Sequence, residues 1–248
     1  MPISVYKKRG ETPLECLHRL RQEKPELLIE TLSYAGRLDP MAEGLMIVLV
    51  GKEENKKREK FLGLDKVYEI EILFGISTDT GDILGRITNY ELGIKNLDKE
   101  RFQNVLRKME GKQIQHYPIF SSKTVLGKPL FEWARENRLD EIEIPAREIE
   151  IYKIKEMGWK HVSKEKVLEN IIENVLKIKG DFRQKEIIKK WQEIVGNFKN
   201  NFEFPVIKLR VHCSSGTYMR ILASLIGEGI TCPALAYSIK RIQIGNFK

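Results

Sequence analysis

The chain has 248 residues, of which 42% are hydrophobic and 31% charged, as in globular domains rather than disordered chains. Its 43 Lys and Arg exceed its 35 Asp and Glu, and the net charge of +8 favours a polyanionic partner such as nucleic acid as much as it fits a merely basic composition. No apolar run approaches the roughly 20 residues of a membrane helix, no signal peptide opens the chain, and three scattered cysteines argue against a disulfide framework. We therefore expect a cytoplasmic protein without a membrane partner.

The first half of the chain alternates helix and strand signals. Thr12 with Glu15 forms a capping box that predicts a helix start. The apolar run from Leu45 to Val50 predicts a buried strand, and apolar residues at every second position from Tyr68 to Phe74 predict a strand with one buried face. The spacing of apolar residues over 98–111 predicts a further helix.

The second half adds a segment of different character. Residues 153–200 carry two amphipathic stripes separated at Gly180, which predicts a helical hairpin inserted between strands. Residues 207–213 alternate as a half-buried strand, and a helix is expected from Thr217. Because the elements lack regular βαβ spacing, we expect an α+β fold with a mainly antiparallel mixed sheet and flanking helices, forming a single domain over 1–248.

The loop over residues 35–45 is the first candidate functional segment. Asp39 precedes Pro40, which restricts Asp39 to extended geometry and stiffens the loop. A carboxylate held in this way suits nucleophilic or acid–base chemistry. Taken alone, the pattern also fits an aspartate that merely caps a turn.

The segment over residues 213–220 is the second candidate. Tyr218 and Arg220 fall in the first turn of the expected helix, where Arg220 could bind a carboxylate or phosphate or could be an exposed surface cation. Cys213 fits a buried structural residue better than a nucleophile. Tyr68 is either a core aromatic or a stacking face for a base. The four histidines have no metal-ligand spacing and there is no phosphate-binding glycine loop, so no metal or cofactor is expected.

Seven segments, in order along the chain, resemble motifs of the TruB family of tRNA pseudouridine synthases. They are residues 8–13 (KRGETP), 36–44 (GRLDPMAEG), 65–68 (DKVY), 74–82 (FGISTDTGD), 120–135 (FSSKTVLG and FEWAR), 145–152 (PAREIEIY) and 213–220 (CSSGTYMR). The resemblance implies the pseudouridine synthase fold and isomerisation of uridine to pseudouridine in the T loop of tRNA, at uridine-55, by a monomer that binds the T stem-loop and needs no cofactor.

The resemblance also implies roles for individual residues. Asp39 matches the family's nucleophilic aspartate, and Tyr68 matches its active-site tyrosine, which stacks on the target base. Tyr218 and Arg220 match a Tyr-x-Arg pair in which Arg220 pairs with Asp39. Ile239 falls where the family has a leucine that contacts the nucleotide.

Some positions depart from the family pattern. Tyr34 replaces a histidine associated with opening the T loop, although Tyr34 could still stack, and Arg37 replaces a threonine, as in synthases that act on ribosomal RNA. These departures, with no C-terminal PUA-type module expected, leave two alternatives. One is a pseudouridine synthase for another RNA, such as ribosomal RNA. The other is an RNA-binding or tRNA-folding protein with secondary catalysis.

Much of the positive charge lies in the expected insertion. Residues 153–200 contain 12 Lys and Arg against 7 Asp and Glu, a net charge of +5 out of the total of +8. We expect this hairpin to contact tRNA phosphates, so that its deletion weakens salt-dependent RNA binding.

Overall fold

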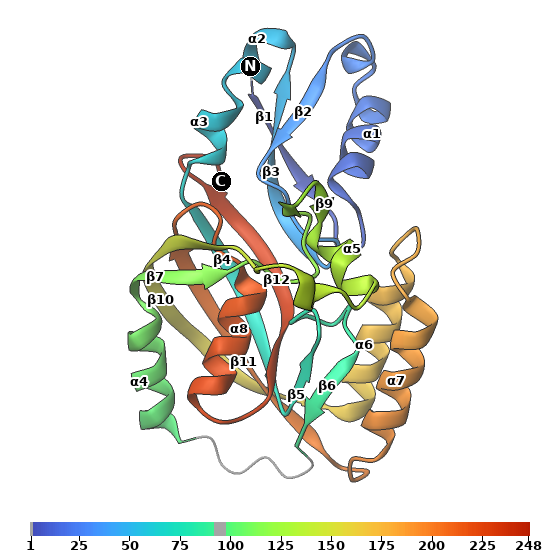
Figure 1. Cartoon of the computed structure of the whole chain (residues 1–248), viewed down its shortest axis with the longest axis vertical. Coiled ribbons are helices and arrows are strands. Elements are labelled where there is room, and N and C mark those ends of the chain that lie inside the picture. The colour runs from blue at the N-terminus through green and yellow to red at the C-terminus, as the bar shows by residue number, and fades with distance from the viewer. Residues whose placement is uncertain (1, 92–97) are drawn as a thin grey trace.

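The computed structural model describes residues 2–91 and 98–248 and has one large mixed sheet at its centre (Figure 1). Neighbouring strands follow the order β1–β3–β12–β4–β11–β10–β7, and β2 also pairs with β3. The strands are β1 (Pro2–Lys7), β2 (Leu32–Ala35), β3 (Ala42–Val50), β4 (Lys66–Phe74), β7 (Gly111–His116), β10 (Ala146–Ser163), β11 (Glu203–Cys213) and β12 (Ala234–Ile244). Only the β3–β12 pairing within this sheet is parallel, which confirms the expected α+β class with a mainly antiparallel sheet.

The β1–β3 end of the sheet carries the N-terminal helices (Figure 1). Helix α1 (Pro13–Glu23) starts with the predicted capping box and buries Leu17 and Leu20 against β1 and β3. A 3₁₀ turn (Pro25–Leu27) follows it. The charged stretch after β3 forms two short helices, α2 (Lys52–Lys56) and α3 (Arg58–Leu62), of which only Phe61 is buried.

Different helices cover the two faces of the wider half of the sheet. Helices α4 (Lys99–Met109) and α8 (Met219–Gly229) pack on the face that presents Ile70, Ile72 and Phe74 of β4. The residues that point to the opposite face include Leu73 of β4, and they pack against two helices, α6 (Lys164–Leu176) and α7 (Gln184–Gly196). Alternation along each strand therefore separates two hydrophobic cores, as the period-two pattern requires.

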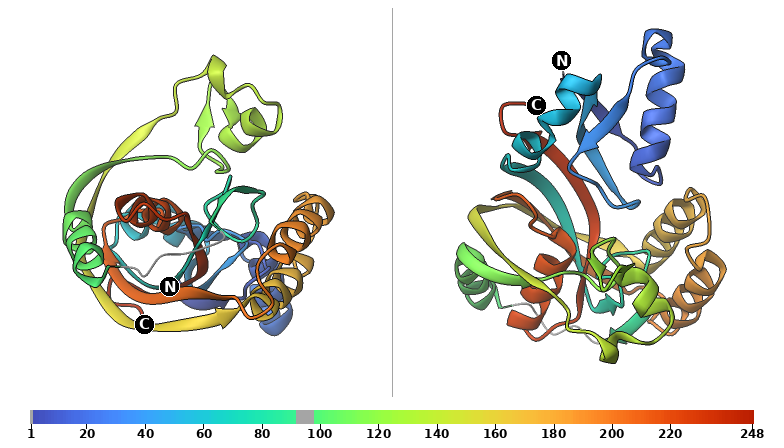
Figure 2. Two further views of the ribbon diagram at one scale, coloured as in Figure 1. Left: turned by 90° about the horizontal axis from the view of Figure 1, so that it is seen from below. Right: turned by 45° about the horizontal axis from the view of Figure 1, so that its top comes forward.

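The inserted helices are α6 (Lys164–Leu176) and α7 (Gln184–Gly196), which lie side by side next to the sheet (Figures 1 and 2). The predicted stripes are mostly confirmed, since Val167, Ile171 and Trp191 are fully buried. The predicted start of the insertion at residue 153 was wrong, because residues 153–163 continue β10 in pairing with β11.

A long excursion between β7 and β10 stands away from the sheet (Figure 2, left). It holds β8 (Thr124–Val125), β9 (Lys128–Pro129), α5 (Leu130–Arg135) and a 3₁₀ turn (Leu139–Glu141). A separate hairpin of β5 (Ile76–Thr78) and β6 (Ile87–Tyr90) lies between the sheet and α7. Within the described residues, every helix is too short or too polar to cross a bilayer.

Candidate active site

Asp39 lies in the loop between β2 and β3, and neighbouring backbone and lysine contacts fix that loop. The Asp39 carbonyl accepts a hydrogen bond from the amide of Ala42 at 3.0 Å. The Gly10 amide donates to the Pro40 carbonyl at 2.9 Å, and the buried Lys7 ammonium donates to the Ala42 carbonyl at 2.6 Å. The loop is thus held by the N-terminal segment, so the Asp39 carboxylate projects from a rigid support.

Arg241 of β12 fixes the same loop from the other side. Its side chain is 1% exposed and donates to the carbonyls of Leu45 at 2.7 Å and Gly36 at 2.9 Å. A buried guanidinium must satisfy its donors, and here backbone carbonyls on both sides of Asp39 do so. Arg241 is therefore a positioning residue for the Asp39 loop.

Close contact between Gly44 and Arg241 gives a first prediction. Gly44 has a φ of +113°, and a Cβ there would lie 2.2 Å from the Arg241 carbonyl oxygen. We expect Gly44→Ala to lower the free energy of unfolding by about 2–4 kcal/mol, since left-handed strain and overpacking add together. Gly111→Ala is the matched control, because Gly111 also has a positive φ of +99° but a Cβ placed there would have no atom of another segment within 4 Å. Equal losses for the two variants in urea denaturation would contradict the clash.

Arg220 pairs directly with Asp39, as the resemblance implied. Its Nε lies 2.8 Å from Asp39 Oδ2, while Nη1 donates to the Thr80 carbonyl at 2.7 Å and Nη2 to the Phe120 carbonyl at 3.4 Å. The Arg220 side chain is 3% exposed, so it is not a surface cation. Asp82 adds a second carboxylate 3.7 Å from Nε. The guanidinium is held on three sides, which directs one donor at the half-buried Asp39 carboxylate.

One cavity of about 330 Å³ brings most of the predicted site residues together. Six of the seven line it, and Arg220 reaches it through Asp39: the six are Tyr34, Arg37, Asp39, Tyr68, Tyr218 and Ile239. Tyr68 and Ile239 form buried walls, whereas Arg37 is exposed and donates to the Tyr34 hydroxyl at 3.2 Å. Burial raises the pKa of Tyr68, although the Arg241 guanidinium opposes the shift, so its hydroxyl is neutral at pH 7.

Tyr218 is held at the start of α8 by Gln115 of β7. The Gln115 side-chain oxygen accepts from the Tyr218 amide at 2.7 Å, and its nitrogen donates to the Tyr218 carbonyl at 3.3 Å. Burial raises the pKa of Tyr218 to about 12, and the Asp39 carboxylate adds to the shift. Tyr218 is therefore a neutral, fixed aromatic wall of the cavity.

Lys66, at the start of β4, is a buried cation on the cavity wall. Its burial leads us to predict that the free energy of unfolding depends on pH. Burial lowers its pKa to about 8 from 10.5, and its Nζ donates to the Leu62 carbonyl at 2.6 Å. Between these two values the folded protein binds fewer protons than the unfolded chain, so the free energy of unfolding increases with pH. Between pH 7.5 and 9 we expect a gain of roughly 1 kcal/mol that is missing in Lys66→Met. Urea titrations at both pH values measure it, and an identical pH response of the two proteins would contradict it.

Lys7, Arg241 and Arg147 are cations of the site for which the sequence predicted no role. Lys7 and Arg241 bind loop carbonyls, and Arg147 lines the cavity beside Gly216 with its buried Nε free of any partner among the described residues. Arg147 lay within a recognised motif, so a charged residue there could have been noted. Lys7 and Arg241 sit in strands, and nothing in their local pattern shows that they point inward. Among the described residues, no cluster of three or more His, Cys, Asp or Glu could hold a metal ion.

Curated relatives match almost the whole chain. The tRNA pseudouridine synthase B of Listeria welshimeri is 30% identical over 246 residues, which cover 99% of this chain and 66% of the relative. The tRNA pseudouridine synthase B of Endomicrobium trichonymphae is 29% identical over 238 residues, covering 96% of this chain and 82% of the relative. The chain thus spans about two thirds of the length of the Listeria relatives.

Solved structures show the same fold at lower identity. A Cbf5–Nop10–Gar1 complex contains a chain with a TM-score of 0.58 and 16% identity, and this protein covers 49% of that chain. An H/ACA RNP bound to a substrate RNA containing 2′-deoxyuridine gives a TM-score of 0.55, also at 16% identity. Residues 24–174 match the family described as "TruB family pseudouridylate synthase (N terminal domain)". With more than half of its length matching that family, and with a buried arginine paired to the motif aspartate, the chain belongs to the TruB family of pseudouridylate synthases.

Proposed function

We propose that this protein isomerises uridine to pseudouridine in tRNA, at uridine-55 of the T loop, with Asp39 as the nucleophile. The observation that carries the proposal is the cavity that Asp39, Tyr68 and Tyr218 share, with Arg220 paired to Asp39. Relatives named tRNA pseudouridine synthase B support tRNA as the substrate. A basic surface suits an RNA partner, since Lys and Arg exceed Asp and Glu by eight.

The chemistry requires one bond to break and another to form on the same nucleotide. The bond between uracil N1 and ribose C1′ breaks, a bond from C5 to C1′ forms, the C5 proton leaves and N1 gains a proton. In this proposal the Asp39 carboxylate forms a transient bond to the nucleotide, and this bond breaks again as pseudouridine forms, which regenerates the carboxylate. The Arg220 guanidinium stabilises the negative charge of Asp39 before the attack and after its release. The target base must leave its stack to reach a cavity of this kind, and Tyr68 offers it a replacement aromatic face.

Turnover on defined tRNA tests the proposal. The wild-type protein should convert one uridine of an unmodified tRNA transcript, and sequencing of pseudouridines should place it at position 55. A transcript with cytidine at that position is the matched control and should gain no pseudouridine. Conversion at another position of tRNA would contradict the proposed site.

Ribosomal RNA gives a second readout. Pseudouridine formation in a ribosomal transcript, and none in tRNA, would favour the alternative that Arg37 raised in the sequence. Tight RNA binding without any turnover would favour a tRNA-folding protein. The first result would contradict the proposed substrate and the second the proposed reaction, while family membership would be unchanged.

A further inference from the structure

The inserted helices occupy a place where the fold needs only a short turn. Strands β10 and β11 are antiparallel neighbours, and Ser163 pairs with Glu203 at their ends. Two residues can close such a hairpin, yet residues 164–202 intervene. Helices α6 and α7 bury Ile171, Ile187 and Trp191 completely in a core on one face of the sheet. The insertion is therefore a packed part of the fold.

The outer end of the insertion, residues 178–183 between α6 and α7, lines a cavity that Asp39 also lines. Asp181, Phe182 and Arg183 line a second cavity of about 610 Å³, which Asp39 and Arg220 also line. This cavity and the 330 Å³ cavity share six lining residues, which are Tyr34, Arg37, Leu38, Asp39, Ser121 and Ser122. The two cavities are thus adjacent spaces that meet at Asp39.

Several contacts hold the outer end of the insertion in place. Arg183 Nη1 lies 3.1 Å from Asp79 Oδ2, and its guanidinium lies 4.6 Å from the centre of the Phe120 ring. Arg135 of α5 donates to the Asp181 carbonyl at 2.6 Å. These contacts make the end of the insertion a fixed wall of the cavity.

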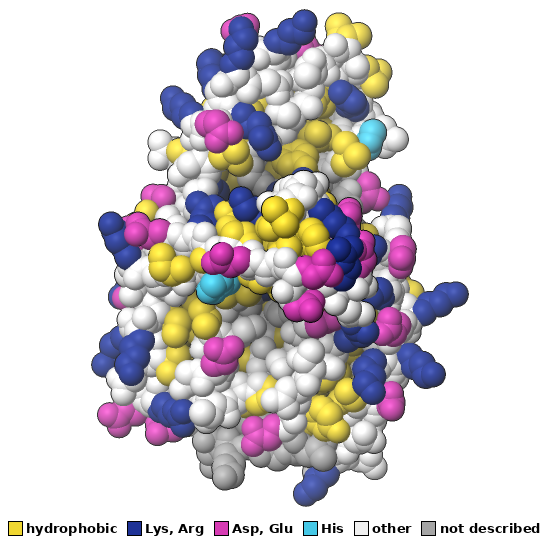
Figure 3. Space-filling model, viewed as in Figure 1, with side chains coloured by type: hydrophobic (Ala, Val, Ile, Leu, Met, Phe, Trp, Pro, Cys, Tyr) yellow, Lys and Arg dark blue, Asp and Glu magenta, His cyan; other side chains and the backbone are white. Residues whose placement is uncertain are grey.

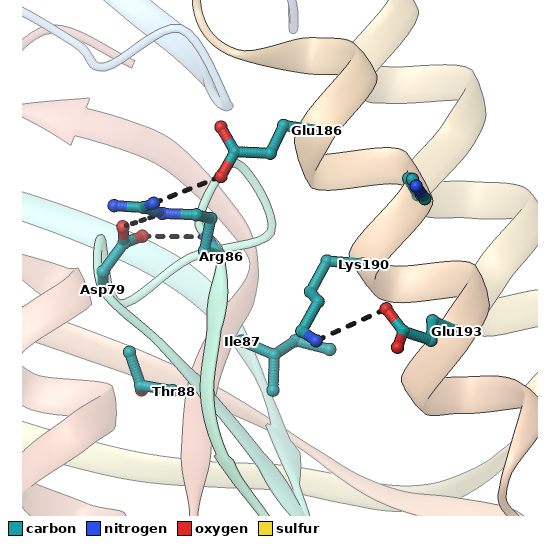
Figure 4. A pocket seen from close by; sticks show the side chains of 8 residues that line it. Asp79, Arg86, Ile87, Thr88, Glu186, Lys190 and Glu193 are labelled. Atoms are coloured by element: carbon teal, nitrogen blue, oxygen red, sulfur yellow. Dashed lines mark hydrogen bonds and ion pairs between the residues drawn. The ribbon is translucent and has the colours of Figure 1, made fainter.

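Asp79 links the same wall to helix α7 and to Arg220. Figure 4 shows Arg86 between Asp79 and Glu186 of α7, with its Nη1 3.1 Å from the Glu186 carboxylate. The next residue after Asp79 is Thr80, whose carbonyl holds Arg220. The insertion therefore joins the loop that orients the Arg220 guanidinium.

The chemistry of the second cavity suits a nucleotide. Three phenylalanine rings line it, Phe120, Phe131 and Phe182, and so do four arginines, Arg37, Arg135, Arg183 and Arg220. Aromatic rings stack on bases of any sequence, and arginines bind phosphates. Its carboxylates are Asp39 and Asp82, both beside Arg220, and Asp181. On the face seen in Figure 3, hydrophobic side chains gather in the middle and Lys and Arg side chains lie on either side of them.

We propose that the 610 Å³ cavity is a second nucleotide subsite, in which Phe182 of the insertion stacks on the base of an RNA nucleotide adjacent to the target. The inference rests on the proposed function, because the target nucleotide would occupy the adjoining 330 Å³ cavity. Because the two cavities share lining residues around Asp39, two adjacent nucleotides of one strand can occupy them together. Phe182 is half-buried against the core and also lines the cavity, so part of its side chain is accessible to a ligand there.

A pairing of protein variants with RNA variants tests the subsite. In an Asp39→Asn background, the dissociation constant is measured for T stem-loop RNAs that each lack one base of the loop. One such abasic RNA should bind about tenfold more weakly than the intact RNA, as expected for one lost stacking contact. Phe182→Ala should weaken the binding of intact RNA by a similar factor. In this variant, loss of that one base from the RNA should cause no further loss of affinity.

Two further variants separate stacking from packing. Phe182→Leu keeps an apolar side chain without an aromatic face. Its affinity for RNA should therefore no longer depend on that one base, the coupling being lost, while its melting temperature should equal that of the parent protein. Phe202→Ala is the matched control, because Phe202 is a partly buried ring packed on the same core but lies outside the cavity. It should leave the coupling intact.

The inference is overturned if Phe182→Ala binds intact RNA with unchanged affinity. It is also overturned if the substitution weakens the binding of every abasic RNA by the same factor. Failure of the proposed function would give a different result, namely no turnover by the wild-type protein. Coupling without turnover would retain the subsite and reject the reaction. Turnover without coupling would retain the reaction and reject the subsite.

Discussion

Replacing Asp39 by asparagine is expected to reduce pseudouridine formation by at least about 10⁴-fold. The amide has nearly the shape of the carboxylate but lacks its negative charge, so it cannot act as the nucleophile, and only binding and positioning effects remain. Arg220 Nε can still donate to the amide oxygen across the 2.8 Å contact. The initial rate of conversion of a tRNA transcript at saturating RNA measures the effect.

The matched control for that prediction is Asp140→Asn. Asp140 lies in the exposed 3₁₀ turn of the β7–β10 excursion, outside both cavities. We expect this control to retain wild-type turnover and RNA affinity. Substantial activity in Asp39→Asn would remove Asp39 from the role of nucleophile and would direct attention to the second carboxylate beside Arg220, Asp82.

Arg220→Met should affect both stability and turnover. Methionine fills much of the same volume but leaves the 6%-exposed Asp82 without its cation, and the Thr80 carbonyl without its donor. Loss of one partner from a buried ion pair costs about 3–5 kcal/mol of unfolding free energy. Turnover should fall as well, because the Asp39 carboxylate loses the group that orients it.

The pH dependence of Arg220→Met provides a second check. Burial already raises the pKa of Asp82, and removal of Arg220 takes away the charge that opposes the rise. A carboxyl whose folded pKa exceeds its unfolded value of 3.8 contributes stability at low pH and loses it as the pH increases. The stability deficit of Arg220→Met should therefore be smaller at pH 4 than at pH 7 in urea denaturation.

Arg210→Met is the matched control for Arg220. Arg210 also pairs with a carboxylate, since its Nη2 lies 2.6 Å from Glu69, but its side chain is 44% exposed. Ion pairs of this kind contribute at most about 1 kcal/mol, so the control should lose little stability and no turnover. Equal losses in both variants would show that burial of Arg220 has no energetic consequence.

The sequence predicted the elements whose pattern is local. Alternation identified the strands around Ile70 and Leu209, the capping box at Thr12 located the first helix, and apolar spacing located the helix within residues 98–111. The strand over residues 153–163 was missed because most of its side chains are exposed, so no apolar alternation marks it. Its pairing with β11 is a long-range contact that a local pattern cannot contain.

The residues of the candidate site also fall into two groups, those that a local motif predicted and those that only long-range contacts define. Asp39 was predicted from its loop and motif, and its pairing with Arg220 from the resemblance, although 181 positions separate the two residues. Arg241 and Lys7 were missed, because their contacts with loop carbonyls exist only once β12 and β1 flank β3. Phe182 falls within the predicted insertion but had no predicted role, and only the folded chain brings it into a cavity with Asp39.

The buried cysteines have a practical consequence for following RNA binding. All three are enclosed, and burial raises the pKa of Cys16 and Cys232 to about 11 and that of Cys213 to about 12. Thiolates are the form that maleimides alkylate, so the native protein should resist labelling at neutral pH. A Lys179→Cys variant, at a side chain that is 86% exposed, would then accept a single fluorophore beside the second cavity. The dye would report the arrival of RNA at the insertion directly, without any change to the native thiols.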